Sequence, residues 1–137
     1  MTKVLFLCTG NSCRSQMAEG FLNGLGKEHY RAYSAGTEPK PVHPLAIRVM
    51  REKNIDISRQ VSKSVTGFLG KSLDYVVTVC DAAAEACPVF PGKTRLLHWS
   101  FEDPAAFVGT ADETLRRFRE IRDQIETAIQ NWLTQRK

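Results

Sequence analysis

Two thiols and one guanidinium lie close together near the start of the 137-residue chain, in the segment CTGNSCRS (residues 8–15). Cys8 and Arg14 have the spacing C-x5-R, and the segment is too polar and too rich in turn-forming residues for a core. Between a strand and a helix, such a turn directs backbone N–H groups into one concavity, where the helix dipole adds positive potential. The segment therefore predicts a cradle for a tetrahedral oxyanion.

Cys8 and Arg14 have distinct predicted roles in this cradle. The planar guanidinium of Arg14 can hold two oxygens of a bound anion at once. The same positive environment stabilises a thiolate at Cys8, which is the nucleophilic form of cysteine. Gly10 permits a positive φ and Asn11 tolerates a left-handed conformation, so the chain can approach the anion closely. The alternative is a chance spacing at a strand end, followed by an ordinary polar turn.

The other residues of the loop have supporting roles in this interpretation. Ser15 is placed to hydrogen-bond the Cys8 thiolate, whereas we expect Cys13 to be a small packing residue. The predicted oxyanion-binding loop comprises Thr9, Gly10, Asn11, Ser12, Cys13, Arg14 and Ser15.

A carboxylic acid is the next group that this chemistry needs, because an oxygen that leaves a tetrahedral oxyanion must be protonated. The segment FEDPAAF offers Asp103 in an Asp-Pro turn that Pro104 makes rigid. Glu102 is the neighbouring candidate, and a plain turn-forming role is the alternative for Asp103.

A second pair of thiols, Cys80 and Cys87, lies in the segment VTVCDAAAEACP. Zinc is a poor explanation, because there is no C-x-x-C pair and the three histidines are scattered singly, at His29, His43 and His98. Two buried inert thiols are an alternative. Residues 81–86 can form a short helix, which would hold the two Cα atoms about 10 Å apart, beyond disulfide range. A disulfide between these thiols would therefore require the segment to rearrange, and short helices melt at low cost.

The elements that must position these groups alternate between apolar runs and helical stretches. We expect strands at residues 3–8, 30–36, 74–80 and 94–99, and helices over about 15–23 and from Pro44 onward. Thr110 and Glu113 offer a capping box for a final helix. Its apolar residues recur at three- and four-residue spacing: Leu115, Phe118, Ile121, Ile125, Ile129, Trp132 and Leu133.

This alternation predicts an α/β fold, with residues 1–137 forming a single three-layer domain built on a four-stranded parallel sheet flanked by helices. In open sheets of this class, ligands bind beyond the carboxyl ends of the strands. Cys8, Cys80 and Asp103 are therefore expected to share one rim.

Composition excludes several classes of protein. The chain is 42% hydrophobic and 25% charged, as globular domains are, so disorder is not expected. The longest apolar run near the N-terminus, residues 4–7, is too short for a signal or a membrane span. We therefore expect a cytoplasmic monomer with reduced thiols. The net charge of +4 favours a small anionic substrate, and the lack of a basic cluster argues against nucleic acid.

These motifs together resemble the thioredoxin-coupled arsenate reductases, which share the fold of low-molecular-weight protein tyrosine phosphatases. The resemblance spans nearly the whole chain and rests on CTGNSCRSQMAEG, YSAGTEP, DYVVTVC and FEDP. It implies that Cys8 attacks arsenate held by the loop and Arg14, while Asp103 protonates the leaving oxygen. It further implies that Cys80 attacks the adduct, which leaves a Cys8–Cys80 disulfide, and that Cys87 converts it to a Cys80–Cys87 disulfide for reduced thioredoxin.

Some members of this family bind potassium beside the loop, and the matching residues here are Asn11, Glu19 and Ser34. The alternative is that Glu19 and Ser34 only brace the loop by hydrogen bonds. No tightly bound cofactor is expected, and the sequence leaves open whether thioredoxin, glutaredoxin or another thiol is the reductant.

Two other functions compete with arsenate reduction. A phosphotyrosine phosphatase would need Cys8, Arg14 and Asp103 but would give the two later cysteines no task. Gln16 and Ala105 stand where such phosphatases usually carry proline and an aromatic residue, and both departures favour the reductase. A non-catalytic redox sensor would need neither the arginine nor the acid.

Overall fold

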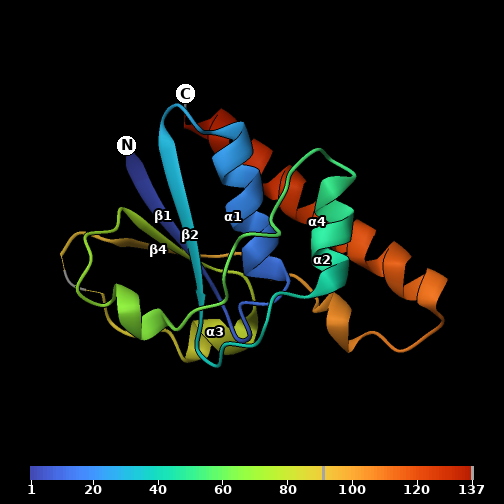
Figure 1. Cartoon of the computed structure of the whole chain (residues 1–137). Coiled ribbons are helices and arrows are strands. Elements are labelled where there is room, and N and C mark those ends of the chain that lie inside the picture. Colours follow the sequence, from blue (N-terminus) through green and yellow to red (C-terminus); the bar gives the residue numbers. More distant parts are fainter. Residues whose placement is uncertain (91, 137) are drawn as a thin grey trace.

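Four strands form one sheet at the centre of the molecule (Figure 1): β1 (Thr2–Cys8), β2 (Tyr30–Gly36), β3 (Tyr75–Thr78) and β4 (Arg95–His98). Every neighbouring pair is parallel, and the order across the sheet is β2-β1-β3-β4. The computed structural model describes residues 1–90 and 92–136. The prediction of a four-stranded parallel sheet flanked by helices is confirmed.

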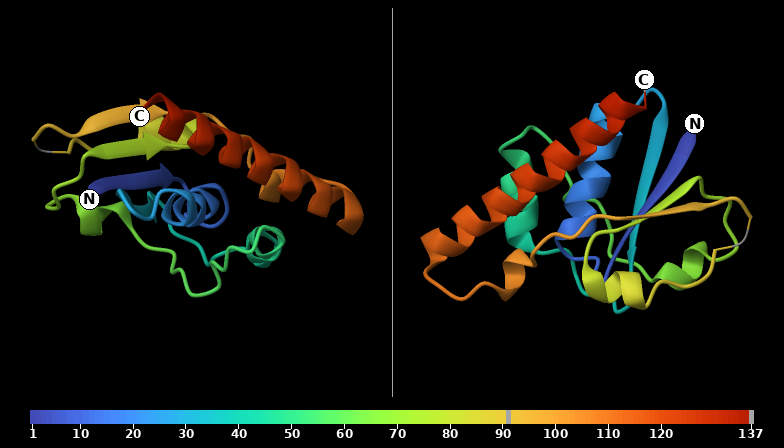
Figure 2. Two further views of the ribbon diagram at one scale, coloured as in Figure 1. Left: turned by 90° about the horizontal axis from the view of Figure 1, so that it is seen from above. Right: turned by 180° about the vertical axis from the view of Figure 1, so that it is seen from behind.

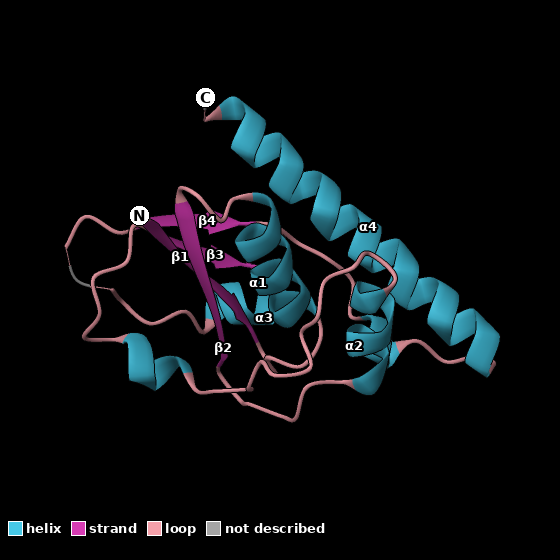
Figure 3. Cartoon of the chain, turned by 45° about the horizontal axis from the view of Figure 1, so that its top comes forward, coloured by secondary structure: helices cyan, strands magenta, loops and turns pink. Residues whose placement is uncertain are grey.

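The helices are α1 (Arg14–Leu25), α2 (Pro44–Arg51), α3 (Asp81–Glu85) and α4 (Ala111–Gln135). α1 packs on β1 and β2, and α4 packs on α1 and α2. Accordingly, α4 lies behind α1 and α2 in Figure 1 and in front of them in the reversed view of Figure 2. The short helix α3 lies near the carboxyl ends of the strands, away from both chain termini (Figure 3). No helix in the described part of the chain is long and apolar enough to cross a membrane.

The buried apolar residues explain why these elements pack in this way. Residues 4–8 of β1 are all buried, because β1 is a central strand, and such strands form continuous apolar runs. On α4, the predicted stripe from Leu115 to Ile129 is buried, while Trp132 and Leu133 pack partly buried at its end. The predicted capping box is confirmed: Thr110 Oγ1 accepts from the Glu113 N–H at 3.1 Å, and the Glu113 carboxylate accepts from the Thr110 N–H at 2.9 Å.

The boundaries differ from the sequence prediction at the elements that carry the site. β3 ends at Thr78 rather than at Cys80, because Cys80 has left the strand and caps the N-terminus of α3 with φ −148° and ψ 155°. The predicted short helix after Cys80 is confirmed as α3. α1 runs through Gly24 and ends at Leu25, with Gly26 as its C-cap, because tertiary packing overrides the weak helix propensity of one glycine.

Candidate active site

The loop between β1 and α1 has its carbonyl groups bonded to the segment that follows β2. This segment, residues 37–43, lies alongside the loop and donates four backbone hydrogen bonds. They run from Thr37 to Cys8 (3.2 Å), Glu38 to Thr9 (2.8 Å), Lys40 to Gly10 (2.8 Å) and His43 to Ser12 (3.0 Å). Because the C=O and N–H of a trans peptide point in opposite directions, the N–H groups of Gly10, Asn11 and Cys13 face away from this segment.

One of these N–H groups is bonded to the sulfur of Cys8. The Asn11 N–H donates to Cys8 Sγ at 3.1 Å. Among the described residues, the amides of Gly10 and Cys13 donate to no protein acceptor, and the Cys13 side chain leaves the start of α1 uncapped. The loop therefore combines an N–H bonded to the thiol with two N–H groups that have no protein acceptor, and successive N–H groups of this kind can bind an anion.

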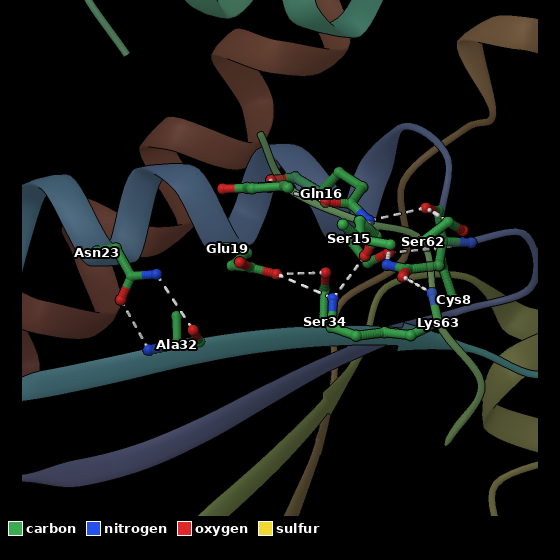
Figure 4. A network of polar contacts seen from close by, with 12 residues as sticks. Cys8, Ser15, Gln16, Glu19, Asn23, Ala32, Ser34, Ser62 and Lys63 are labelled. Atoms are coloured by element: carbon green, nitrogen blue, oxygen red, sulfur yellow. Dashed lines mark hydrogen bonds and ion pairs between the residues drawn. The ribbon is translucent and has the colours of Figure 1, made fainter. Parts of the chain in front are cut away.

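Ser15 lies 2.7 Å from Cys8 Sγ through its hydroxyl oxygen, in the position that the sequence predicted (Figure 4). This oxygen already accepts a hydrogen bond from the Asn11 side-chain amide at 2.8 Å. The hydroxyl proton of Ser15 is thus left to donate to the sulfur. The buried sulfur of Cys8 thus has two hydrogen-bond donors directed at it, the Asn11 N–H and the Ser15 hydroxyl.

The left-handed residue of the loop is Asn11, with φ 49°, as its tolerance of that conformation allowed, whereas Gly10 does not use its freedom to adopt a positive φ. The Asn11 side chain holds this conformation, because its Oδ1 accepts from the Lys63 N–H at 3.0 Å. Gly36 at the end of β2 is required for a different reason. A Cβ at Gly36 would lie 2.5 Å from the Thr9 carbonyl oxygen, so any side chain there would displace the loop.

Residues 60–63 brace the loop from behind, and the sequence analysis missed them. Ser62 Oγ lies 3.1 Å from the Gly10 carbonyl and 3.0 Å from the Asn11 carbonyl. Gln16 on α1 donates to the Asn11 carbonyl at 3.0 Å, and Gln60 donates to the Gln16 side chain at 2.7 Å. The only signal in the sequence is that this segment is polar, which does not identify its partner.

Arg14 and Asp103 face each other across the pocket above Cys8. Arg14 Nη2 lies 3.7 Å from Asp103 Oδ2, and Arg14 Nη1 donates to the Phe101 carbonyl at 3.1 Å. Asp103 Oδ1 also accepts from the Ala105 N–H at 3.0 Å, so the turn-forming alternative holds beside the contact with Arg14. Glu102, the other candidate acid, pairs instead with Arg117 at 2.9 Å and is not among the residues lining the pocket. The geometry therefore favours Asp103.

The pocket has a volume of about 250 Å³ and is lined by the loop, Asp103 and Ala105. Three further lining residues, which sequence reasoning did not single out, are Glu38, Lys40 and His43. Lys40 adds a cation at the mouth of an anion site. Burial lowers the pKa of His43, and its Nδ1 accepts from the Leu45 N–H at 3.1 Å as the cap of α2.

Cys80 is buried at the start of α3, next to the loop. Its Sγ accepts from the Ala83 N–H at 3.4 Å and lies 3.4 Å from the hydroxyl of Thr9, the residue after Cys8. Cys87 lies beyond the end of α3, half-buried, and burial raises the pKa of its thiol. Cys13 is buried at the wall of the pocket, and burial raises the pKa of its thiol to about 12, so the thiol stays protonated. All four cysteines are free thiols.

The residues matched to a potassium site do not fit a metal ion. Ser34 Oγ donates to Glu19 Oε1 at 2.5 Å, and the Lys63 ammonium lies 3.8 Å from the same oxygen (Figure 4). Asn11 Oδ1 is occupied by the Lys63 N–H. Burial raises the pKa of Glu19, and the hydrogen bond from Ser34 and the charge of Lys63 oppose this rise. Within residues 1–90 and 92–136, no three His, Cys, Asp or Glu side chains gather as metal ligands.

Comparison with known proteins agrees with this geometry. Residues 3–137 match the family described as low molecular weight phosphotyrosine protein phosphatase. The chain is 44% identical to the arsenate reductase of Halalkalibacterium halodurans, over 94% of this chain and 93% of the relative. A solved arsenate reductase in the phosphate binding state has a TM-score of 0.77 and 36% identity, with 98% of each chain covered.

A thioredoxin-dependent arsenate reductase of Corynebacterium glutamicum has a TM-score of 0.67 and 27% identity, covering 95% of this chain and 62% of that chain. The resemblance drawn from the sequence motifs is therefore confirmed. Its strongest support is the match from residue 3 to residue 137, which includes the loop, the acid and all four cysteines. The chain belongs to the low molecular weight phosphotyrosine protein phosphatase family.

Proposed function

We propose that this protein reduces arsenate to arsenite through a relay of Cys8, Cys80 and Cys87, and that thioredoxin restores the reduced enzyme. The observation that carries the proposal is the position of Cys80, whose sulfur lies 3.4 Å from the Thr9 hydroxyl of the anion loop. Hydrolysis of a phosphate ester gives a second thiol at this point no task. Reduction requires a second thiol, because two thiols supply the two electrons that pass to arsenic and are left as a disulfide.

In the first step, the Cys8 thiolate attacks the arsenic atom of arsenate and forms an S–As bond. The loop N–H groups and the Arg14 guanidinium hold the oxyanion oxygens. Asp103, which faces Arg14 at the edge of the pocket, gives a proton to the departing oxygen, which leaves as water. Arsenic is still pentavalent at this point.

In the second step, the Cys80 thiolate attacks the sulfur of Cys8. The S–As bond breaks and its electron pair passes to arsenic, which leaves as trivalent arsenite, while a Cys8–Cys80 disulfide forms. The Ala83 N–H and the Thr9 hydroxyl are placed to stabilise the attacking thiolate, since each is 3.4 Å from its sulfur.

In the third step, Cys87 attacks the sulfur of Cys80 and releases Cys8 as a thiolate. The helix α3 separates the two thiols and must open, which is inexpensive for an element of five residues. The resulting Cys80–Cys87 disulfide is reduced by a thioredoxin dithiol, which supplies the two electrons that arsenate received. A thioredoxin-dependent arsenate reductase among the solved relatives supports this choice of reductant over glutaredoxin.

Phosphatase activity is the competing function within the same family. It would use Cys8, Arg14 and Asp103 alone. Ala105 places a methyl group at the wall of the pocket, and Gln16 ties α1 to the loop and to residues 60–63. These residues and the contact of Cys80 with the loop favour reduction as the main activity.

The proposal extends to the setting in which the protein works. Residues 1–137 act as a single domain and as a monomer in the cytoplasm, with no tightly bound cofactor. The substrate is a small oxyanion, and neither nucleic acid nor a membrane is a partner. The mildly basic net charge of +4 is consistent with an anionic substrate.

The test is consumption of NADPH by the protein with thioredoxin and thioredoxin reductase, with and without arsenate. We expect turnover only when arsenate is present, with one arsenite formed per NADPH consumed. Cys8→Ser should abolish it, whereas Cys13→Ser should retain it. Turnover that is absent, or that does not depend on arsenate, would disprove the reductase. Replacing thioredoxin by glutaredoxin and glutathione in the same assay identifies the reductant.

A further inference from the structure

Glu19 is a largely buried carboxylate directly behind the anion loop. It lies on α1 with 14% of its side chain exposed, and its Oε1 accepts a hydrogen bond from Ser34 of β2. A buried carboxylate is costly unless a cation accompanies it. The Lys63 ammonium is the cation of the described residues that lies within ion-pair distance of Glu19, at 3.8 Å.

Lys63 is also bound to the loop through its main chain. Its N–H donates to Asn11 Oδ1 at 3.0 Å, and its carbonyl accepts from the Gly36 N–H at 2.8 Å. Its ammonium donates in addition to the Val61 carbonyl at 2.7 Å. Lys63 therefore holds the side chain of the left-handed Asn11 through its main-chain N–H. Its ammonium carries the charge that faces Glu19 (Figure 4).

We infer that the Lys63 ammonium is a built-in cation of the anion loop and performs the task that a bound potassium ion would perform between Asn11, Glu19 and Ser34. An alkali cation takes oxygen ligands, and an ammonium already beside those oxygens repels it. Here the Glu19 oxygen faces Ser34 and the ammonium, and Asn11 Oδ1 is bonded to the Lys63 amide. A tethered ammonium is a compact charge with three donors and is present at every salt composition. Loop stability and turnover are thus independent of potassium.

The first test compares the unmodified protein in potassium chloride and in tetramethylammonium chloride at the same ionic strength. The melting temperature and the rate of arsenate reduction should agree in the two salts. A potassium-specific rise in rate of about threefold or more, or a rise in melting temperature of several degrees, would overturn the inference. The rate arm rests on the proposed function, whereas the melting arm does not. Absence of arsenate reduction in both salts therefore counts against the proposed function alone.

The second test removes the tethered charge. Lys63→Gln leaves Glu19 without a counter-charge, and we expect the melting temperature to fall by about 5 °C or more in tetramethylammonium chloride. Potassium should restore part of this loss, because the variant leaves oxygen donors and a charge for a metal ion. Lys63→Arg keeps a cation and should melt close to the unmodified protein in both salts.

The matched control is Lys71→Gln, which neutralises an exposed lysine of the same chain. Two results would overturn the inference. One is a Lys63→Gln variant that melts like Lys71→Gln in both salts. The other is a destabilised Lys63→Gln variant that potassium stabilises no more than tetramethylammonium does, which would show that Lys63 is a structural contact and does not replace an ion.

Discussion

The hydroxyl of Thr9 lies 3.4 Å from the sulfur of Cys80, although the two residues are 71 positions apart in the chain. The two meet because β1 and β3 are parallel neighbours, so the residues that follow them emerge at the same edge of the sheet. The contact joins the loop that carries the first cysteine to the second cysteine of the proposed relay.

Thr9→Val should slow the second step of the relay. The substitution keeps the shape of the side chain and removes the hydroxyl donor to Cys80. A hydrogen bond to a charged group contributes about 1.5–3 kcal/mol, so formation of the Cys8–Cys80 disulfide should slow by about tenfold or more. Single-turnover quenching followed by mass spectrometry measures this rate. Thr134→Val on α4 serves as the control, and equal rates for the two variants would contradict the role of Thr9.

Cys87→Ser should stop the enzyme after one turnover. Without the third thiol, the Cys8–Cys80 disulfide has no internal thiol to resolve it, so about one arsenite should form per molecule. Counting arsenite and identifying the disulfide by non-reducing peptide mapping checks both expectations. Cys13→Ser is the matched control and should cycle normally. Continued cycling of Cys87→Ser would mean that another thiol completes the relay.

Asp103→Asn should impair the first step while leaving anion binding intact. General acid catalysis typically contributes 10²–10⁴-fold, so turnover should fall by about that factor. Phosphate, a non-reducible analogue, should still raise the melting temperature, because the loop and Arg14 are unchanged. Glu102→Gln is the control, since Glu102 pairs with Arg117 and should be nearly silent. If Glu102→Gln loses the turnover that Asp103→Asn is expected to lose, Glu102 would be the acid instead.

Asp81→Asn should make α3 easier to open. His98 Nε2 lies 2.9 Å from Asp81 Oδ1, Ser100 donates to the same oxygen at 3.1 Å, and His98 Nδ1 lies 2.7 Å from Thr78 Oγ1. These bonds connect Asp81, the first residue of α3, to His98 of β4 and to Ser100 just after it. Through His98 they also reach Thr78 of β3. Exposed pairs contribute little to stability, so hydrogen exchange across α3 should accelerate by only about two- to fivefold. Asp112→Asn on α4 is the control, and unchanged exchange in α3 would exclude this role.

Glu52 should make stability depend on acid pH. The hydrogen bonds from Arg119, and then from Arg122, lower the pKa of Glu52 from 4.5 to about 2 in the folded protein. Because the folded pKa is the lower one, this contribution to stability is fully present above about pH 4.5 and is lost as the pH falls toward about 2. Glu52→Gln should therefore lose less stability than the unmodified protein between about pH 6 and pH 3 in thermal melts. Glu28→Gln is the control. If both variants lose the same stability as the pH falls, the role of Glu52 would be contradicted.

The sequence predicted best the features that depend on near neighbours along the chain. The capping box of Thr110 and Glu113 and the short helix after Cys80 could be predicted because their contacts lie within four residues. The contact of Ser15 with Cys8 spans one loop and was also predicted. The left-handed conformation of Asn11 was allowed for, but the group that holds it could not be predicted, because Lys63 lies 52 residues away.

By itself, the sequence determined the α/β class, the oxyanion loop with its thiol and arginine, and the set of later residues that completes the proposed chemistry. Only the tertiary structure decided which of these meet: Thr9 with Cys80, Arg14 with Asp103 rather than Glu102, and Glu19 with Lys63. The physical reason is range. Helix starts, caps and loop conformations follow from local backbone chemistry, whereas contacts between distant segments follow from the strand order and from core packing, which brings those segments to one edge of the sheet.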